Sequence, residues 1–455
     1  MSTLLFRAAP LRRLPLAVLL PLAFASTSQA QSLVDIYEMA KGHDATFQSA
    51  RSQYEANLAK ADQGKAALLP TVALSAGATR TQLESYAIKG SPAPTQDRPY
   101  TTQTAGINAS QPLYRPANLA TYRQSQKGLE LAEAAMSQAE QDLIVRVSQA
   151  YFDVLSAQDS LAFVQAQKAA VAEQLASAKR NFEVGTATIT DTREAQARFD
   201  LVTAQEIAAD NDLRVKSVAL ELLVGKAGLK PKRIQSGAKL PAVDVQSIDN
   251  WVAQSEQHHP GLRQARANLD VAKLETEKAA AGHKPTVDFT LGYNSQRNIN
   301  GTSVQFTGVT NQINIASVGI TANLPLFAGF ATQNRIREAA ALEDKARSDL
   351  EGAQRQVAQV TRTAYLGLQA GQGQVKAYEA AEASSQVALE ANKLGYQVGV
   401  RINIDVLNSQ SQLYQTKRDL AKARYDVLVG QLKLRQAAGV LKAEDLQPIN
   451  ALLAP

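Results

Sequence analysis

The order of helical and alternating hydrophobic patterns divides the chain into two similar halves. Residues 32–67 and 248–282 have the apolar spacing of helices, and each of these segments is followed by strand-like alternation. In the second half, for example, Val287, Phe289 and Leu291 alternate with polar or small residues. The helical spacing then returns for a long stretch in each half. The pattern therefore predicts two units, each built as a helix, a β-hairpin and long helices.

Landmark residues recur in the same order in both halves, about 214 residues apart. The segment 182–185 (FEVG) corresponds to 396–399 (YQVG), Ala150-Tyr151 to Ala364-Tyr365, Asp191 to Asp405, and Gly225 to Gly439. A period of this length indicates a duplicated, domain-sized unit and not a solenoid. We assign residues 31–225 to the first repeat, with a hairpin at 70–113, and residues 249–439 to the second, with a hairpin at 285–326. Residues 226–248 form a linker or equatorial segment between them, and residues 440–455 a C-terminal equatorial segment.

Each half contains two alternating segments of about ten residues, the length that a tilted strand needs to cross a bilayer. One face of each segment is apolar and the other is small or polar, which fits a barrel between lipid and water. A soluble sandwich is the alternative, but two separate hairpins between long helices make a poor sandwich. One chain also supplies too few strands to close a wide barrel. We therefore expect an oligomer. Residues 83–100 and 298–312, between the strands of each hairpin, are expected to form exposed outer loops.

The helical segments after the hairpins are unusually long. No proline occurs between Pro116 and Pro231 or between Pro325 and Pro448. Pro116 suits the first position of a helix, and a continuous helix from there to Val184 would extend roughly 100 Å. Heptad-like spacing, in Leu143, Val147, Ala150, Val154 and Leu161 and in their repeat counterparts, favours helices coiled on neighbours. Breaks at 185–190 and 399–404 predict turns between coiled helices.

The first thirty residues have the pattern of a secretory signal peptide. Arg7, Arg12 and Arg13 precede an apolar run, and Ala30 ends a small-residue cleavage pattern. A transmembrane anchor is the alternative, but the run is broken by Pro15 and Pro21 and is too short to span a bilayer. We assign residues 1–30 to the signal peptide.

Composition excludes several chemistries. With 0 Cys, the chain has no thiolate metal site, lipid-attachment cysteine or thiol nucleophile. Its 4 His form no metal-ligand or catalytic-triad pattern, so we expect no enzyme, no cofactor and no metal. The net charge of +6 includes three signal-peptide arginines, and the modest remainder does not suggest a nucleic-acid partner.

The duplicated order of segments, with the turn sequences at 184–191 (VGTATITD) and 396–407 (YQVGVRINIDVL), resembles the TolC family of outer-membrane efflux proteins. The likeness extends over nearly the whole mature chain. It implies a mixed α and β membrane protein, a homotrimer whose subunits each give four strands to one transmembrane β-barrel. A long coiled α-helical barrel would continue it into the periplasm of a Gram-negative bacterium.

The resemblance also implies the function of a passive exit duct for drugs or secreted proteins in a tripartite efflux pump or type I secretion system. Such a duct is opened at its periplasmic end by a periplasmic adaptor (membrane fusion protein) and an inner-membrane transporter of the ABC or RND type. Outer-membrane lipid would surround the barrel. A soluble periplasmic coiled-coil adaptor or structural protein is the alternative, and the four alternating segments argue against it.

The family pattern implies roles for residues at the two helical turns. Thr190, Asp191, Tyr396 and Arg401 match the positions whose links hold the periplasmic gate shut. Asp405 matches a constriction ring of carboxylates, and Asn408 stands where a second aspartate ring would be, which implies a weaker cation trap. From the residues alone, Asp191 and Asp405 also suit helix capping, and Asp191 with Glu194 has capping-box spacing.

Overall fold

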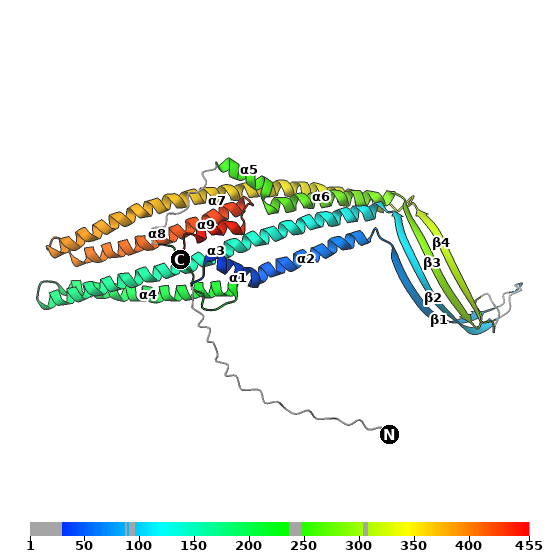
Figure 1. The fold of residues 1–455 in the computed structure, drawn as a ribbon, viewed down its shortest axis with the longest axis horizontal. Helices are drawn as coiled ribbons and strands as arrows, with labels where there is room; N and C mark the ends of the chain where they lie inside the picture. Colours follow the sequence, from blue (N-terminus) through cyan, green and yellow to red (C-terminus); the bar gives the residue numbers. More distant parts are fainter. Residues whose placement is uncertain (1–29, 87–88, 91–95, 236–246, 304–307, 455) are drawn as a thin grey trace, which may run out of the picture.

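The computed structural model describes residues 30–86, 89–90, 96–235, 247–303 and 308–454. The predicted signal peptide, apart from Ala30, lies outside these residues. The described chain is elongated, with its strands at one end and two helical turns at the other (Figure 1). None of the described helices is both long enough and apolar enough to cross a membrane.

The elements follow the predicted order of helix, hairpin and long helices in each half. The first half contains α1 (Leu33–His43), α2 (Ala45–Ala66), β1 (Thr71–Ser85), β2 (Gln96–Tyr114), α3 (Pro116–Glu183) and α4 (Ile189–Val224). The second half contains α5 (Ile248–His258), α6 (Pro260–Ala280), η1 (Ala281–His283), β3 (Thr286–Ile299), β4 (Asn311–Asn323), α7 (Ala331–Gln397) and α8 (Asn403–Ala437). The short η2 (Ala443–Leu446) and α9 (Gln447–Asn450) follow. The prediction that Pro116 begins a very long helix is confirmed, because α3 has 68 residues with proline in its first turn.

The helices expected at 32–67 and 248–282 are each broken into two, which the apolar spacing did not reveal. Asp44 ends α1 and caps α2, its side chain accepting from the Phe47 amide at 2.7 Å. Pro260 cannot continue α5, and the His259 side chain caps α6 by accepting from the Gly261 amide at 3.0 Å. Local capping chemistry therefore overrides a continuous helical pattern.

The two hairpins form one antiparallel sheet in the order β1-β2-β3-β4, so the expectation of separate hairpins is wrong. Strand β2 pairs with β3 from Thr101 to Tyr114, with an irregularity between Pro112 and Tyr114. The strands have 15, 19, 14 and 13 residues, longer than the expected ten. Their outer ends, including Pro99 paired with Gln82, belong to the predicted loop. These ends were missed because polar residues occupy both faces there.

The long helices pack along the predicted seam. Leu143, Val147 and Val154 on α3 are buried, and so are Val357 and Leu368 on α7. The largest hydrophobic cluster lies where α1, α3, α4, α8 and α9 meet. There the Phe152 ring contacts the rings of Tyr151 and Tyr425, with centroids 5.5 and 5.6 Å away.

Residues after α4 and after α8 close this cluster. The Tyr151 hydroxyl donates to the Lys232 carbonyl at 2.8 Å, and Ile234 bridges to Leu453. The chain segments at 226–235 and near the C-terminus therefore contribute to the middle of the molecule, where α1 and α9 also lie (Figure 1).

An ion pair fixes the break between α1 and α2. The Asp44 carboxylate is 5% exposed and accepts from both terminal nitrogens of Arg146, each at 3.0 Å. Burial raises the pKa of Asp44, but the hydrogen bonds from Arg146 and the Phe47 amide outweigh it, so the pKa is lowered. The carboxylate therefore contributes stability above its unfolded pKa of about 4, and this contribution is lost as the pH falls through the lower folded pKa.

We predict that Asp44→Asn lowers the free energy of unfolding at pH 7 by about 1 to 3 kcal/mol, because a buried, charge-assisted hydrogen bond is weakened. The variant should also lose less stability than the parent below about pH 4, since it cannot take up that proton. Chemical denaturation at pH 7 and pH 3, followed by circular dichroism, measures both effects. Asp426→Asn is the control, because its pair with Lys422 is exposed. A loss equal to that of the control would contradict the prediction.

Candidate functional site

The predicted gate residues lie at the two helical turns, at the end of the molecule opposite the sheet (Figure 1). Gly185 begins the turn after α3 and Gly399 the turn after α7, both with φ of 77°, a left-handed conformation that glycine adopts without strain. The amide of Thr186 donates to the Asn181 carbonyl and that of Val400 to the Gly395 carbonyl, both at 2.8 Å. The prediction of turns at these two glycines is confirmed.

Helix α4 begins with a complete capping box. The Thr188 side chain accepts from the Asp191 amide at 3.2 Å, and the Asp191 carboxylate accepts from the Thr188 amide and hydroxyl at 2.9 and 2.7 Å. Asp191 is thus the third residue of the helix and not its cap, so its expected box with Glu194 is wrong. Thr188 takes the capping position because its hydroxyl reaches the free amide of Asp191.

Helix α8 begins without that box, because Ile402 occupies the position that corresponds to Thr188. Ile402 makes no side-chain cap. Asp405, like Asp191, is the third residue of its helix and not the cap that we expected. Its carboxylate lies 3.7 Å from Nη1 of Arg401, which is exposed. One Thr to Ile difference between the repeats therefore gives the two aspartates different partners.

Tyr396 and Thr190, the other predicted gate residues, have the following contacts and exposure within one chain. The Tyr396 hydroxyl accepts from Nδ2 of Asn181 at 3.4 Å, and its ring packs against a cluster that includes Leu389. Thr190 is exposed on the first turn of α4. Tyr396 is bonded to Asn181 and not to Asp191 inside the chain. The expected links join neighbouring coils, and they stay a prediction.

Asn403 is a site residue that the sequence reasoning missed. It is the first residue of α8 and is 0% exposed. Its Nδ2 donates to the Asp191 carbonyl at 3.3 Å, and its Oδ1 accepts from Nε2 of Gln174. Asn403 therefore joins the start of α8 to both α3 and α4. One difference between the repeats could have identified it. Asn403 is polar, whereas the corresponding residue of the first half, Ile189, is apolar.

Asn408 also connects the two helical hairpins. Its Oδ1 accepts from Nη2 of Arg198 on α4 at 2.8 Å. The preceding residue, Leu407, is 0% exposed and belongs to a cluster with Val171 and Ala195. The amide at position 408 thus accepts an intramolecular hydrogen bond close to the turns.

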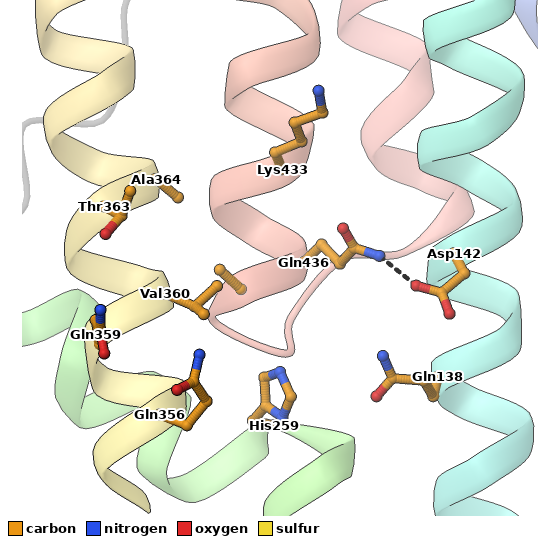
Figure 2. A pocket seen from close by; sticks show the side chains of 11 residues that line it. Gln138, Asp142, His259, Gln356, Gln359, Val360, Thr363, Ala364, Lys433 and Gln436 are labelled. Carbon is orange, nitrogen blue, oxygen red and sulfur yellow. Dashed lines mark hydrogen bonds between the residues drawn. The ribbon is translucent and has the colours of Figure 1, made fainter. Parts of the chain in front are cut away.

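Away from the turns, a cavity of about 530 Å³ lies halfway along the helices. Figure 2 shows His259 below the ends of Gln436 and Asp142, with Gln138 and Gln356 on either side. Gln436 donates to Asp142 at 2.6 Å. Burial lowers the pKa of His259 against the opposing effect of Asp142, and burial raises the pKa of Asp142. In the neutral imidazole, Nδ1 can accept the hydrogen bond from the Gly261 amide that caps α6. The role of His259 that the structure shows in this cavity is therefore that of a helix cap.

The described residues contain no group of three or more His, Cys, Asp or Glu side chains placed to hold a metal ion. The arrangement at the turns consists of helix caps, one ion pair and amide hydrogen bonds between two hairpins. Each of these contacts is individually modest in energy, so small movements of the helices can make or break them.

Comparison with known proteins identifies relatives of the chain. The family described as Outer membrane efflux protein matches residues 36–226 and 251–440. The outer membrane protein TolC of Vibrio cholerae is 34% identical over 96% of this chain and 98% of its own length. The alkaline protease secretion protein AprF of Pseudomonas aeruginosa is 32% identical over 93% of this chain and 87% of its own.

Solved structures share the fold at lower identity. The outer membrane protein VceC of Vibrio cholerae superposes with a TM-score of 0.73 at 20% identity, covering 90% of this chain and 96% of VceC. The CmeC outer membrane channel of Campylobacter jejuni gives a TM-score of 0.74 at 16% identity, covering 98% of each chain. The arrangement of long helices and strands is thus that of these proteins.

We predict that Asn403→Ala loosens the contact between the two turns without unfolding the chain. Two hydrogen bonds are lost and the Asp191 carbonyl loses a donor, which corresponds to about 1 to 3 kcal/mol of local stability. Amide hydrogen exchange at the first turns of α4 and α8 should therefore become about tenfold faster or more. Thr190→Ala, an exposed change at the same turn, is the control. Unchanged exchange in Asn403→Ala would show that its contacts do not hold the turns together.

Proposed function

This chain belongs to the outer membrane efflux protein family, and from that membership we propose how its subunits form and close a channel. The observation that carries the function is the family match to both halves of the chain, together with relatives aligned over almost their full length. The protein is an outer-membrane channel for efflux or type I secretion that extends into the periplasm. Its family and relatives are channel proteins and not enzymes.

The sheet carries an exposed apolar face that suits contact with lipid. Val72, Ala109, Leu291 and Val318 form one row across the four strands in the observed register, and Leu74 pairs with Ile107 in the next row. Leu74 is 82% exposed in the single chain. The opposite face carries mostly small and polar residues, including Asn108 and Ser317. We propose that the first face meets the bilayer core and that the second lines a water-filled lumen.

The sheet has two open edges, β1 and β4, in the described chain. Unpaired backbone groups are very costly in lipid, so these edges need strands from neighbouring subunits. Three subunits with four strands each would close one barrel of twelve strands, as the family resemblance implies. We therefore propose a homotrimer.

Two helices carry exposed heptad seams that support the same assembly. On α4 the seam consists of Ala208, Asn211, Val215, Val218 and Leu222, and on α7 it consists of Ala380, Ser384, Val387, Ala391 and Leu394. Spacings of three and four place each set on one helix face. Val218 is 62% and Val387 65% exposed in the single chain. We propose that α4 of one subunit packs against α7 of the next, with residues 31–225 and 249–439 as structural repeats around the tunnel.

We propose that the turns close the periplasmic end of the tunnel. Tyr396 and Arg401 would link to Asp191 and the region of Thr190 on a neighbouring coil. Three copies of Asp405 would form a negatively charged constriction, which the nearby Arg401 partly neutralises. Asn408 in place of a second carboxylate makes this ring a weaker trap for multivalent cations.

The proposed partners are a periplasmic adaptor and an inner-membrane transporter of the ABC or RND type. Relatives support this assignment by name, since AprF is a protein of alkaline protease secretion and PrtF of Dickeya chrysanthemi one of protease secretion. The transporter would supply the energy, and the channel would be a passive exit for its cargo. A soluble adaptor, the alternative, is not favoured by these relatives.

We predict that Val215→Asp combined with Val218→Asp prevents trimer assembly, because carboxylates would be buried in the proposed seam. Light scattering of the detergent-solubilised protein should give a trimer for the parent and smaller species for the variant. Val215→Ala with Val218→Ala is the control and should remain trimeric. Circular dichroism should show the same helix content in all three. A stable, membrane-inserted monomer of the parent chain would contradict the proposed function.

We predict that Tyr396→Phe combined with Arg401→Ser raises the resting conductance in planar bilayers while the trimer stays folded. Each lost link should contribute about 1 to 2 kcal/mol, and three subunits multiply the effect. A loss of about 1.4 kcal/mol in total already changes the ratio of open to closed channels tenfold.

Tyr414→Phe combined with Arg355→Ser makes the same chemical changes away from the turns and should leave the conductance unchanged. If the first double variant is trimeric but conducts no more than the parent, Tyr396 and Arg401 do not form the closure.

A further inference from the structure

The apolar face of the sheet ends at charged residues. From the row of Val287 to the row of Ala76, no residue on this face of the four described strands is charged. The next two rows contain Arg297 and then Arg80, which are both exposed. These rows belong to the end of the sheet that lies away from the helices (Figure 1). The apolar band is therefore bounded by two arginines at its outer end.

The depth of this boundary matches the thickness of a membrane. Arg297 follows Val287 by ten residues of continuous strand, which extend about 34 Å along the strand. A strand tilted by about 40° crosses about 26 Å of bilayer over that length, and the outward apolar band of membrane barrels is about 25 Å tall. Arg297 thus lies at the level where the hydrocarbon of the outer leaflet meets the lipid headgroups, and Arg80 lies one row beyond it.

Neither arginine has a partner within the part of the chain that the structure describes. No ion pair or side-chain hydrogen bond joins Arg80 or Arg297 to another described residue. The acids on the same face of the described strands are Glu84 and Asp97, which are opposite each other in the register two rows beyond Arg80. Each of them accepts a hydrogen bond from a neutral side chain of its own hairpin. The charge of the two arginines is therefore not balanced by the chain itself.

The two arginines are spaced to hold a headgroup between them. They lie on β1 and β3, two strands and one row apart, so their Cα atoms are separated by about 12 Å. Thr101 and Gln103 lie between them on β2, and their hydroxyl and amide groups can bond to sugar hydroxyls. A guanidinium offers N–H donors in a planar fork that matches two phosphate oxygens. The chemistry of this surface therefore fits a phosphorylated sugar.

We propose that Arg80, Arg297 and the polar side chains between them bind the phosphorylated sugar headgroup of lipopolysaccharide, the glycolipid of the outer leaflet. Its acyl chains would lie on the apolar rows that include Leu74 and Tyr293. The position of the arginines at the end of the sheet away from the periplasmic helices selects the outer leaflet. This inference rests on the proposed function, because it requires the apolar face of the sheet to contact lipid.

The test uses the full mature chain in a nonionic detergent. It is titrated with lipid A, the membrane-embedded part of this glycolipid, and in parallel with the same lipid after removal of its phosphates. Native mass spectrometry counts the bound lipid and gives both affinities. Each arginine near an anionic surface contributes roughly fivefold in affinity, so we expect the parent to bind the phosphorylated lipid about tenfold more tightly or better. Arg80→Gln combined with Arg297→Gln should reduce this preference to about twofold or less.

Arg51→Gln combined with Arg355→Gln is the matched control. It removes the same charge from α2 and α7, where the two side chains are 61% and 79% exposed and pair with acids of their own helices. This variant should keep the full preference for phosphorylated lipid A. Arg80→Lys with Arg297→Lys keeps the charges without the fork and should retain more of the preference than the glutamine variant, because an ammonium group binds phosphate as a point charge.

A parent trimer that binds both forms of lipid A equally would overturn this inference and leave the proposed channel intact. A preference that persists in the double glutamine variant would also overturn it. Equally tight binding of phosphatidylglycerol, which has one phosphate and no sugar, would overturn the assignment to a glycolipid. The same spectra report the oligomeric state, so a parent found only as a monomer would contradict the proposed trimer separately.

Discussion

Helix α3 is the constraint on which the rest of the structure depends. It has 68 residues, roughly 100 Å of helix, and contacts α1, α2, α4, α6 and α8 along its length. A helix of this length gains its stability mainly from packing of its apolar face. Other helices must therefore pack against α3 along its whole length. This packing gives the molecule its elongated shape and places the sheet and the turns at opposite ends.

The same constraint leaves each subunit incomplete. Inside the chain, α3 buries the seam that includes Leu143 and Val147, whereas α4 and α7 keep apolar seams exposed. The sheet likewise keeps two open edges. Exposed seams and open edges both need more protein, and the proposed trimer would satisfy both at once.

The two repeats share an architecture but differ where the function is proposed to lie. Thr188 captures Asp191 in a capping box, whereas Ile402 leaves Asp405 to pair with Arg401. At the next position Ile189 corresponds to the buried Asn403, which joins the hairpins. A few substitutions at equivalent turns therefore give α4 a capped first turn and give α8 a first turn that is linked to neighbouring helices. Residues at equivalent positions of the two repeats cannot be assumed to have the same role.

The sequence by itself determined the duplication, the element order, the start of α3 at Pro116 and the turns at Gly185 and Gly399, because each depends on local spacing, proline or glycine. Tertiary structure alone decided that the two hairpins form one sheet, that Asn403 joins the turns and that Arg80 and Arg297 lie near each other on one face of the sheet. These features bring together residues about 200 apart in the chain, such as Asn403 with Asp191 and Arg80 with Arg297. Long-range packing chooses such partners, and no periodicity within one segment records that choice.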